Sequence, residues 1–302
     1  MSCHSPIKAW KGRKVGENGK RPIVFDMSEG FVDLPLTLPC GKCLGCLLDR
    51  SKNWAIRMKH EIDMNEENCF ITLTYEDDYL PKEGLVKEHF QQFMKRLRWK
   101  YDGKRFKFYA VGEYGTDFGR PHYHSLLFGL DFSDKVHWAL RNGNKSFRSD
   151  ILESLWPWGH CEIGEACFES AAYVSRYLVK DYSEGIGQKG VREWREAVGM
   201  TPEFCLMSRG GRVKGSHGIG YGWYESFHEE LLKFDSIRVR DREMSPPRYY
   251  DKLLANDYPE FAEKIKRLRR GRPGEPDKSE RQLYADALIA KKRLTLKSGG
   301  NL

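Results

Sequence analysis

The sequence predicts an α+β fold in which helices pack against a central antiparallel sheet, followed by a mostly helical, basic C-terminal region. Three observations favour this class. Strand-like and helix-like segments follow one another in the order β-α-β-β-α-β-α between residues 69 and 182. Two of the strands are joined by a short turn, which is typical of an antiparallel hairpin. The intervening helices carry an apolar face, which indicates packing against the sheet.

We expect three parts in the chain of 302 residues, which is long enough for one large domain or two smaller ones. Residues 1–66 form a Cys-rich segment and a helix. Residues 67–184 form the α+β core. Residues 185–302 form a basic region that is first Gly-rich and then helical.

The N-terminal part contains a compact cysteine motif. Residues 1–39 show no clear periodicity, and they lead into Pro39-Cys40-Gly41-Lys42-Cys43-Leu44-Gly45-Cys46. Three thiolates at this spacing can surround one structural Zn²⁺, and Cys3 or His4 is the candidate fourth ligand. An iron–sulfur cluster, which needs a fourth cysteine, and reduced cysteines packed as small apolar residues are the alternatives.

The core elements are predicted from their periodicity. Residues 69–75 alternate and are rich in β-branched and aromatic side chains, as in a strand. Residues 86–99 place four apolar side chains on one helical face: Phe90, Phe93, Met94 and Leu97. The remaining expected elements are helices over 47–65, 149–156, 168–182, 221–234 and 248–268, and strands over 106–115, 122–129 and 160–164.

The predicted hairpin carries a candidate metal site. Its second strand begins Gly119-Arg120-Pro121-His122-Tyr123-His124, and strand alternation places both histidines on one face. Glu113 ends the partner strand and can reach that face. Two imidazoles and one carboxylate make a three-ligand site with open positions, although non-heme iron enzymes use the same donors and ordinary hydrogen-bonded histidines are the simpler alternative.

The last helix of the core carries candidate nucleophiles. Spacing of four places Tyr173 and Tyr177 one above the other, and Lys180 lies near the same face. A phenol with a pKa near ~10 is a poor nucleophile at neutral pH, so it needs a metal or a nearby cation. An aromatic core stripe is the alternative, and the neighbouring metal hairpin favours the catalytic interpretation.

Charge and composition favour a polyanionic partner. The 51 Lys and Arg exceed the 43 Asp and Glu, which gives a net charge of +8, and 13% of the residues are aromatic. The segment 208–220 is either a phosphate-contacting loop or a flexible linker, and 264–272 is either a DNA-backbone contact or a solvated helix end. With no long apolar stretch and no signal peptide, we expect a cytoplasmic protein without membrane contact.

Three motifs occur in the order of a known superfamily: Phe70-Ile71-Thr72-Leu73-Thr74-Tyr75, Gly119-Arg120-Pro121-His122-Tyr123-His124 and Tyr173-Val174-Ser175-Arg176-Tyr177-Leu178-Val179-Lys180. They resemble the motifs of HUH endonucleases, named for His, hydrophobic residue, His. The paired tyrosines resemble the replication initiation proteins of microviruses, and the cysteine motif resembles the gokushovirus branch. The resemblance covers roughly residues 39–182.

The resemblance implies an enzyme that nicks single-stranded origin DNA and rejoins it in rolling-circle replication of a phage genome. Glu113, His122 and His124 would hold Mg²⁺ or Mn²⁺. A tyrosine, Tyr173 or Tyr177, would attack phosphorus and retain a 5′-phosphotyrosine. Lys180 or Arg176 would act as the nearby cation.

The implied setting is the cytoplasm of a bacterial host, with the host replication helicase and polymerase as partners, because no helicase-like phosphate loop is present. The alternatives are an HUH transposase or relaxase, and a non-catalytic zinc-containing DNA-binding protein.

Overall fold

A computed structural model describes residues 3–298 except 18, 116–118, 142, 180–193, 196, 211–216 and 272–277. The chain separates into two compact units. One comprises Met1–Arg50 with Arg270–Gly300, and the other is built on Ser51–Arg269. Each unit is described by itself. The three-part division expected from the sequence stays a prediction.

The first unit contains a small antiparallel sheet that the sequence did not predict. Its strands, in the order β2-β1-β3, are β1 (Ile7–Gly12), β2 (Ile23–Val24) and β3 (Gly30–Leu38), with the 3-10 turn η1 (Met27–Glu29) before β3. Most side chains of β3 are exposed, so no apolar alternation marks the strand. The unit also contains the helix α10 (Glu280–Ser298).

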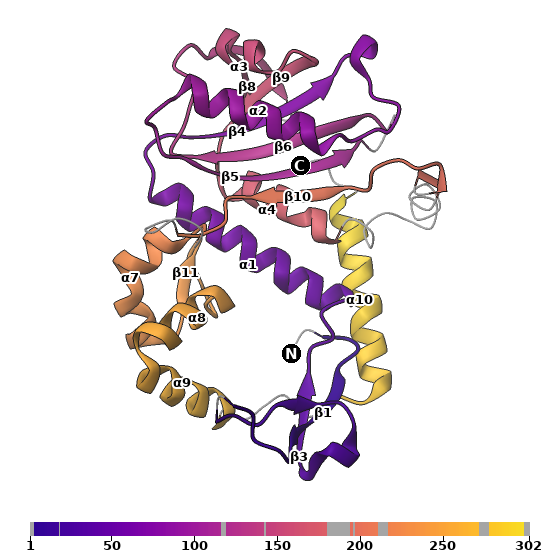
Figure 1. The fold of residues 1–302 in the computed structure, drawn as a ribbon, viewed down its shortest axis with the longest axis vertical. Helices are drawn as coiled ribbons and strands as arrows, with labels where there is room; N and C mark the ends of the chain where they lie inside the picture. The colour runs from indigo at the N-terminus through magenta and orange to yellow at the C-terminus, as the bar shows by residue number, and fades with distance from the viewer. Residues whose placement is uncertain are drawn as a thin grey trace. The chain divides into compact units, whose positions relative to one another are not determined.

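The second unit is built on a seven-stranded sheet in the order β10-β5-β6-β4-β9-β8-β7, and every strand pair in it is antiparallel (Figure 1). The predicted antiparallel α+β architecture is therefore confirmed. The strands are β4 (Asn68–Tyr75), β5 (Lys107–Tyr114), β6 (Pro121–Phe128), β7 (Val136–Arg141), β8 (Asn144–Arg148), β9 (Gly159–Gly164) and β10 (Phe204–Met207).

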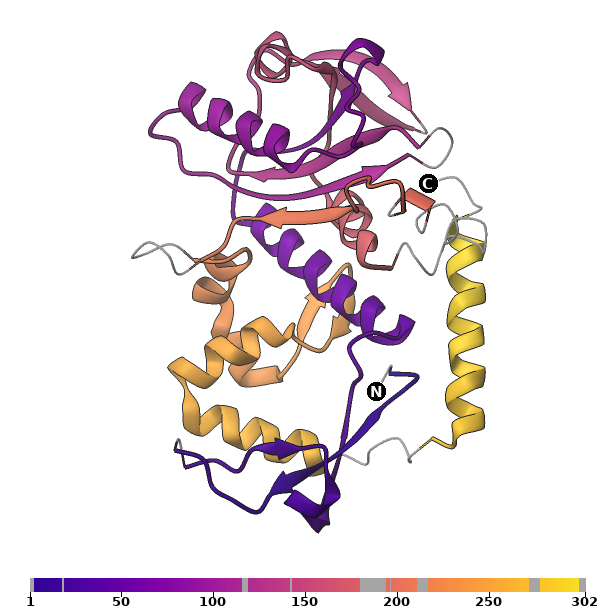
Figure 2. The same cartoon turned by 45° about the vertical axis from the view of Figure 1, so that its right-hand side comes forward.

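Two parts of this sheet were missing from the sequence-based prediction. The β7–β8 hairpin exposes Val136, Trp138 and Leu140, so its pattern is not that of a half-buried strand. Strand β10 has only four residues and pairs with β5 along the edge of the sheet (Figure 2). Short strands that depend on distant partners leave little local signal.

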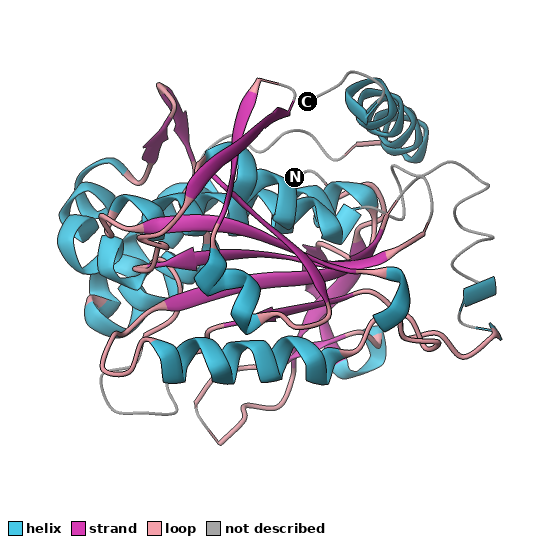
Figure 3. Cartoon of the chain, turned by 90° about the horizontal axis from the view of Figure 1, so that it is seen from above, coloured by secondary structure: helices cyan, strands magenta, loops and turns pink. Residues whose placement is uncertain are grey.

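Helices cover both faces of the sheet (Figure 3). On one face lie α2 (Lys87–Lys100) and α3 (Asp150–Leu155), and α2 buries the four predicted core residues Phe90, Phe93, Met94 and Leu97. On the other face, α1 (Leu44–Asp63) contributes Met58 and α4 (Phe168–Arg176) contributes Ala171 and Val174. The second face is the one that carries the candidate site.

The C-terminal part of this unit has its own apolar cluster. Its elements are α7 (Tyr221–Phe234), β11 (Ile237–Val239), β12 (Arg242–Met244), α8 (Arg248–Asp257) and α9 (Pro259–Gly271). The sequence predicted one helix over 248–268, which is wrong. Pro259 lacks an N–H group and disfavours the helical conformation at Tyr258, so α8 ends and a new helix begins. The turn η2 (Asp77–Tyr79) follows β4.

Within the described residues, no helix combines the length and apolar character that crossing a bilayer requires.

A buried histidine makes the stability of this unit depend on pH. His60 on α1 stacks on Trp223 with ring centroids 3.9 Å apart and contacts the Tyr250 hydroxyl at 2.8 Å. Burial, together with the charge of Lys59, lowers the pKa of His60 to about 3. Between this value and ~6.5, the unfolded chain binds more protons, so stability decreases as the pH falls.

We expect the free energy of unfolding to be about 1.4 kcal/mol lower at pH 5.5 than at pH 8 through this residue alone. The measurement is urea unfolding of the wild type and of His60→Gln at both pH values. The variant is less stable at pH 8 but has the smaller pH dependence. An equal pH dependence in the two proteins contradicts the assignment.

Candidate active site

Glu113, His122 and His124 meet on the helix-covered face formed by α1 and α4. Pairing of β5 with β6 places Glu113 directly opposite His122, and His124 follows two residues later on the same face. The Nε2 atoms of both histidines lie 3.2 Å from Glu113 Oε1. All three side chains offer ligand atoms within 4.8 Å of one another. The structure therefore brings together the three residues that the hairpin predicted.

Hydrogen bonds aim both imidazoles at the common point. His122 Nδ1 lies 3.0 Å from the carbonyl oxygen of Arg120. Because a carbonyl only accepts, Nδ1 carries the proton and Nε2 presents its lone pair to Glu113. His124 Nδ1 contacts Thr72 Oγ1 at 2.9 Å, which leaves its Nε2 facing the same carboxylate. Thr72 was not singled out from the sequence, because its contact depends on the pairing of β4 with β6.

This donor set fits a divalent cation. One carboxylate oxygen and two imidazole nitrogens converge with lone pairs facing one another, and such an arrangement is favourable when a cation lies between them. Glu113 and His124 are buried and His122 is half-buried, so the charge of Glu113 is poorly screened by water. The cluster is compatible with Mg²⁺ or Mn²⁺, and open positions would remain for other oxygen ligands.

Tyr173 lies beside the three ligand candidates. Its hydroxyl donates to Glu113 Oε1 at 2.9 Å and lies 3.3 Å from His124 Nε2. The residue is 41% exposed, so its ring is open to a large substrate. Partial burial, and next the negative charge of Glu113, raise the pKa of Tyr173 well above the usual value of a phenol. The hydroxyl is therefore protonated at neutral pH while that charge is uncompensated.

Tyr177 has a different partner from Tyr173. Helix α4 ends at Arg176, earlier than the predicted end at residue 182, and Tyr177 begins the 3-10 turn η3 (Tyr177–Val179). The Tyr177 hydroxyl donates to the backbone carbonyl of Glu203 at 2.8 Å. Arg176 is half-buried. Lys180, the expected cation, lies outside the described residues.

Glu203 is a site neighbour that the sequence did not reveal. It directly precedes β10, and its Oε1 accepts a hydrogen bond from the backbone N–H of Tyr114 at 2.9 Å. Its carboxylate also contributes to the raised pKa of Tyr173, after burial and Glu113. Only the pairing of β10 with β5 brings Glu203 to this end of the sheet (Figure 2).

The cysteine motif forms a second cluster, in the first unit. Cys3, Cys40, Cys43 and Cys46 place their sulfurs within 4.8 Å of one another, so Cys3 joins the motif. The Sγ–Sγ distances are 3.8 Å for Cys43–Cys3 and 4.0 Å for Cys40–Cys46. A tetrahedral ion with metal–sulfur bonds of ~2.3 Å requires sulfurs ~3.8 Å apart. The spacing fits one divalent ion better than a multi-iron cluster.

Backbone N–H groups around the cysteines favour thiolates. The N–H of Cys43 donates to Cys40 Sγ at 3.3 Å, and the N–H of His4 donates to Cys43 Sγ at 3.2 Å. Although burial acts in the opposite direction, the N–H groups of Lys42 and Cys43 lower the pKa of Cys40 to about 6. Gly41 has φ +76°, a conformation that suits glycine and turns the chain between the first two cysteines.

The two basic segments of the C-terminal part differ in their surroundings. Within 264–272, Arg269 pairs with both Asp235 and Asp251, so this cation joins α7, α8 and α9. Of the segment 208–220, residues 211–216 lie outside the described residues. Ser208 and Gly218 on either side are held by hydrogen bonds to β5.

The fold and the two clusters define a class: an α+β protein with a His-His-Glu cluster beside a tyrosine on its sheet, and a four-cysteine cluster in a separate unit. Comparison with known proteins gives the family. The profile of the family of replication-associated proteins that is named after ORF2 matches residues 68–182. No solved structure matches the chain.

Curated relatives extend the match over most of the chain. It is 30% identical over 270 residues to replication-associated protein VP4 of Bdellovibrio phage phiMH2K, covering 86% of this chain and 79% of the relative. It is 31% identical over 280 residues to replication-associated protein ORF2 of Spiroplasma virus 4, covering 85% and 82%. For replication-associated protein ORF4 of Chlamydia phage 1, the identity is 32% over 225 residues, covering 72% and 53%.

The chain belongs to the family of replication-associated proteins of small phages. The resemblance found in the sequence motifs is thereby confirmed.

Proposed function

We propose that this protein initiates rolling-circle replication by nicking single-stranded origin DNA and later rejoining it. The single observation that carries the proposal is the position of the Tyr173 hydroxyl, 2.9 Å from Glu113 and 3.3 Å from His124. A nucleophile next to a divalent-cation site is the arrangement that phosphodiester cleavage through a covalent intermediate requires.

In the proposed reaction the Tyr173 oxygen attacks phosphorus, and the bond from phosphorus to the 3′ oxygen breaks. The 5′ phosphate stays on the tyrosine, and the 3′ oxygen takes up a proton and becomes the primer end. A bound Mg²⁺ or Mn²⁺ supplies orientation of the scissile phosphate and compensation of its charge. Glu113, His122 and His124 hold that ion, and Glu113 accepts the hydrogen bond of Tyr173.

Tyr177 is proposed as the second nucleophile. The phosphotyrosine preserves the energy of the broken phosphodiester, so rejoining needs no nucleotide cofactor. After one round of synthesis, Tyr177 attacks the regenerated origin, and the released 3′ hydroxyl closes the first product. For this step Tyr177 must leave the Glu203 carbonyl that its hydroxyl now contacts. Lys180 or Arg176 is the candidate cation near the tyrosines.

We further propose that the four cysteines hold one structural Zn²⁺ and that the protein works with the host replication helicase and polymerase in the bacterial cytoplasm. The relatives are replication-associated proteins of phages, which favours replication over transposition or plasmid transfer. A non-catalytic zinc-containing DNA-binding protein is the alternative from another class.

The test is an adduct assay. A 5′- or 3′-labelled single strand of the phage origin is incubated with the protein and Mn²⁺, and covalent protein–DNA adducts are resolved on a denaturing gel. The wild type is expected to form an adduct that EDTA prevents. A double variant, Tyr173→Phe with Tyr177→Phe, is expected to form none. An unchanged adduct in the double variant, or no adduct in the wild type, overturns the proposal.

Metal binding by the hairpin is expected to depend on Thr72, which orients His124. Thr72→Val keeps the shape of the side chain but removes the contact with His124 Nδ1. Loss of such an orienting group typically weakens metal affinity by roughly 10–100-fold. The measurement is calorimetric titration with Mn²⁺.

The matched control is Thr74→Val on the same face of β4. Its hydroxyl makes no hydrogen bond within the part of the chain that the structure describes. The control is expected to bind Mn²⁺ as the wild type does. Equal affinities of Thr72→Val and Thr74→Val would show that Thr72 does not position the ligand.

A further inference from the structure

A large cavity lies at the opposite end of β5 and β6 from the metal-ligand cluster. Its volume is about 1090 Å³, at the upper end of the range for ligand sites. The cavity is lined where Lys107 pairs with Phe128, whereas Glu113 pairs with His122 at the other end of the same strands. Six residues of extended chain separate Lys107 from Glu113, which amounts to about 20 Å at ~3.3 Å per residue.

The walls of this cavity are positively charged. Exposed cations reach it from α2, from the turn before β5 and from the residues after β10: Lys95, Arg98, Lys104, Arg105 and Arg209. Lys104 pairs with Glu67. For the other four, no ion pair is found within the described residues. Glu61 is the one carboxylate that lines the cavity, and Lys107 compensates it at 2.8 Å.

Aromatic rings lie between these cations. Phe106, Phe108 and Tyr221 line the cavity and are half-buried, so part of each ring faces the open space. Arg98 lies over the Phe108 ring at 5.7 Å, and His217 stacks on Tyr221 with centroids 3.6 Å apart. Cations interleaved with aromatic faces are the composition of single-strand binding grooves, in which bases stack and phosphates pair with cations.

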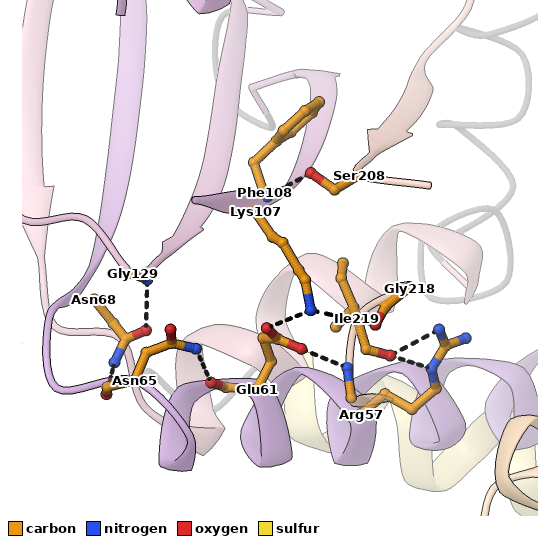
Figure 4. A network of polar contacts seen from close by, with 11 residues as sticks. Arg57, Glu61, Asn65, Asn68, Lys107, Phe108, Gly129, Ser208, Gly218 and Ile219 are labelled. Atoms are coloured by element: carbon orange, nitrogen blue, oxygen red, sulfur yellow. Dashed lines mark hydrogen bonds and ion pairs between the residues drawn. The ribbon is translucent and has the colours of Figure 1, made fainter. Parts of the chain in front are cut away.

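The cavity walls are held together by a polar network (Figure 4). Arg57 on α1 donates to the Ile219 carbonyl from Nε at 3.0 Å and from Nη2 at 2.9 Å, and Glu61 accepts from the N–H of Gly220 at 2.6 Å. On the other wall, the N–H of Phe108 donates to Ser208 Oγ at 3.0 Å. These contacts tie α1, β5 and the chain on either side of 211–216 to one another, so the site is largely pre-formed.

We propose that this cavity binds the backbone of single-stranded DNA at a distance from the phosphate that is cleaved. The proposal rests on the proposed function, which supplies the single strand. Its cations come from three chain segments around a long opening, which suits a run of phosphates better than one small anion. At ~3.4 Å per stacked nucleotide, about six nucleotides span the 20 Å between cavity and cluster.

The test is equilibrium binding of fluorescein-labelled dT20, followed by fluorescence anisotropy in EDTA over a range of salt concentrations. The test variant combines Lys95→Ala, Arg98→Ala, Arg105→Ala and Arg209→Ala. The matched control removes four exposed cations from the surface around α7 and α8: Lys233→Ala, Arg238→Ala, Arg242→Ala and Lys252→Ala. Both variants lose the same net charge, so only the location differs.

In the test variant, the slope of log affinity against log salt is expected to decrease by about 2 to 3, because each phosphate contact on a single strand contributes about 0.7. The control is expected to change the slope by less than about 1. Equal slopes in the two variants overturn the proposal, as does tighter binding of a dT20·dA20 duplex than of dT20.

The assay separates this proposal from the nicking proposal, because EDTA prevents cleavage. Normal adducts with equal slopes leave the nicking reaction standing and remove the groove. A reduced slope in the test variant, together with no adduct in the wild type, supports the groove and removes the nicking reaction.

Discussion

Tyr173→Phe is expected to abolish the covalent protein–DNA adduct, whereas Tyr177→Phe is expected to retain the first cleavage. The two phenols have different surroundings. The Tyr173 hydroxyl contacts Glu113 and His124, whereas the Tyr177 hydroxyl donates to the carbonyl of Glu203. Only Tyr173 is therefore placed to attack a phosphate held at the metal-ligand cluster.

The magnitude distinguishes the two roles. Loss of a nucleophile lowers the rate by on the order of 10³-fold or more. Tyr177→Phe loses one hydrogen bond, worth about 1 kcal/mol of stability, and its first cleavage is expected to stay within a few-fold of the wild type. The measurement is the rate of adduct formation on a labelled origin strand with one cleavage site and Mn²⁺.

A second substrate tests the joining step. On a strand with two origins, Tyr177→Phe is expected to form the first adduct but not the closed circle. Both substitutions keep the aromatic ring, and Tyr173→Phe keeps the edge contact with Phe70 at 6.2 Å, so folding is retained. Adducts that persist in Tyr173→Phe and disappear in Tyr177→Phe reverse the order of the two nucleophiles.

The ligand cluster could be predicted because its geometry is local. Residues 113 and 122 lie on adjacent strands joined by a short turn, so sequence distance alone limits their register. Strand alternation then places His124 beside His122. What the sequence could not supply is the orientation of the imidazoles, because Thr72 reaches His124 only through the pairing of β4 with β6.

The surroundings of Tyr177 could not be predicted for a related reason. Helical spacing placed Tyr177 above Tyr173, but α4 ends between them and β10 adds a partner from a distant part of the chain. A four-residue strand with half-buried side chains has no periodicity to recognise. The basic cavity was missed likewise, since its cations belong to three segments that only the folded sheet brings together.

The cysteine cluster illustrates how a metal substitutes for a core. The strands of the first unit expose most of their apolar side chains, including Val32 and Leu34 of β3. Such a small sheet buries little apolar surface and gains little stability from it. The motif itself was legible from sequence, whereas its fourth member, Cys3, is identified by a sulfur 3.8 Å from that of Cys43.

Cys43→Ser is therefore expected to remove zinc and unfold the first unit. Structural zinc contributes about 10–16 kcal/mol of apparent folding free energy in small domains, so loss of one thiolate removes much of the stability of this unit. Metal analysis of protein purified under reducing conditions is expected to give one zinc per wild-type chain and almost none in the variant. Hydrogen exchange over β1 and β3 is expected to rise toward that of an unfolded chain.

Cys167→Ser is the matched control. Cys167 caps the N-terminus of α4, where serine is equally suited to accept a hydrogen bond from the first turn. This variant is expected to retain zinc and normal exchange in β1 and β3. A wild type without zinc removes the metal proposal. Because Glu113, His122, His124 and Tyr173 all belong to the second unit, Cys43→Ser is also expected to form adducts on a short origin strand, and their loss would mean that catalysis requires the folded first unit.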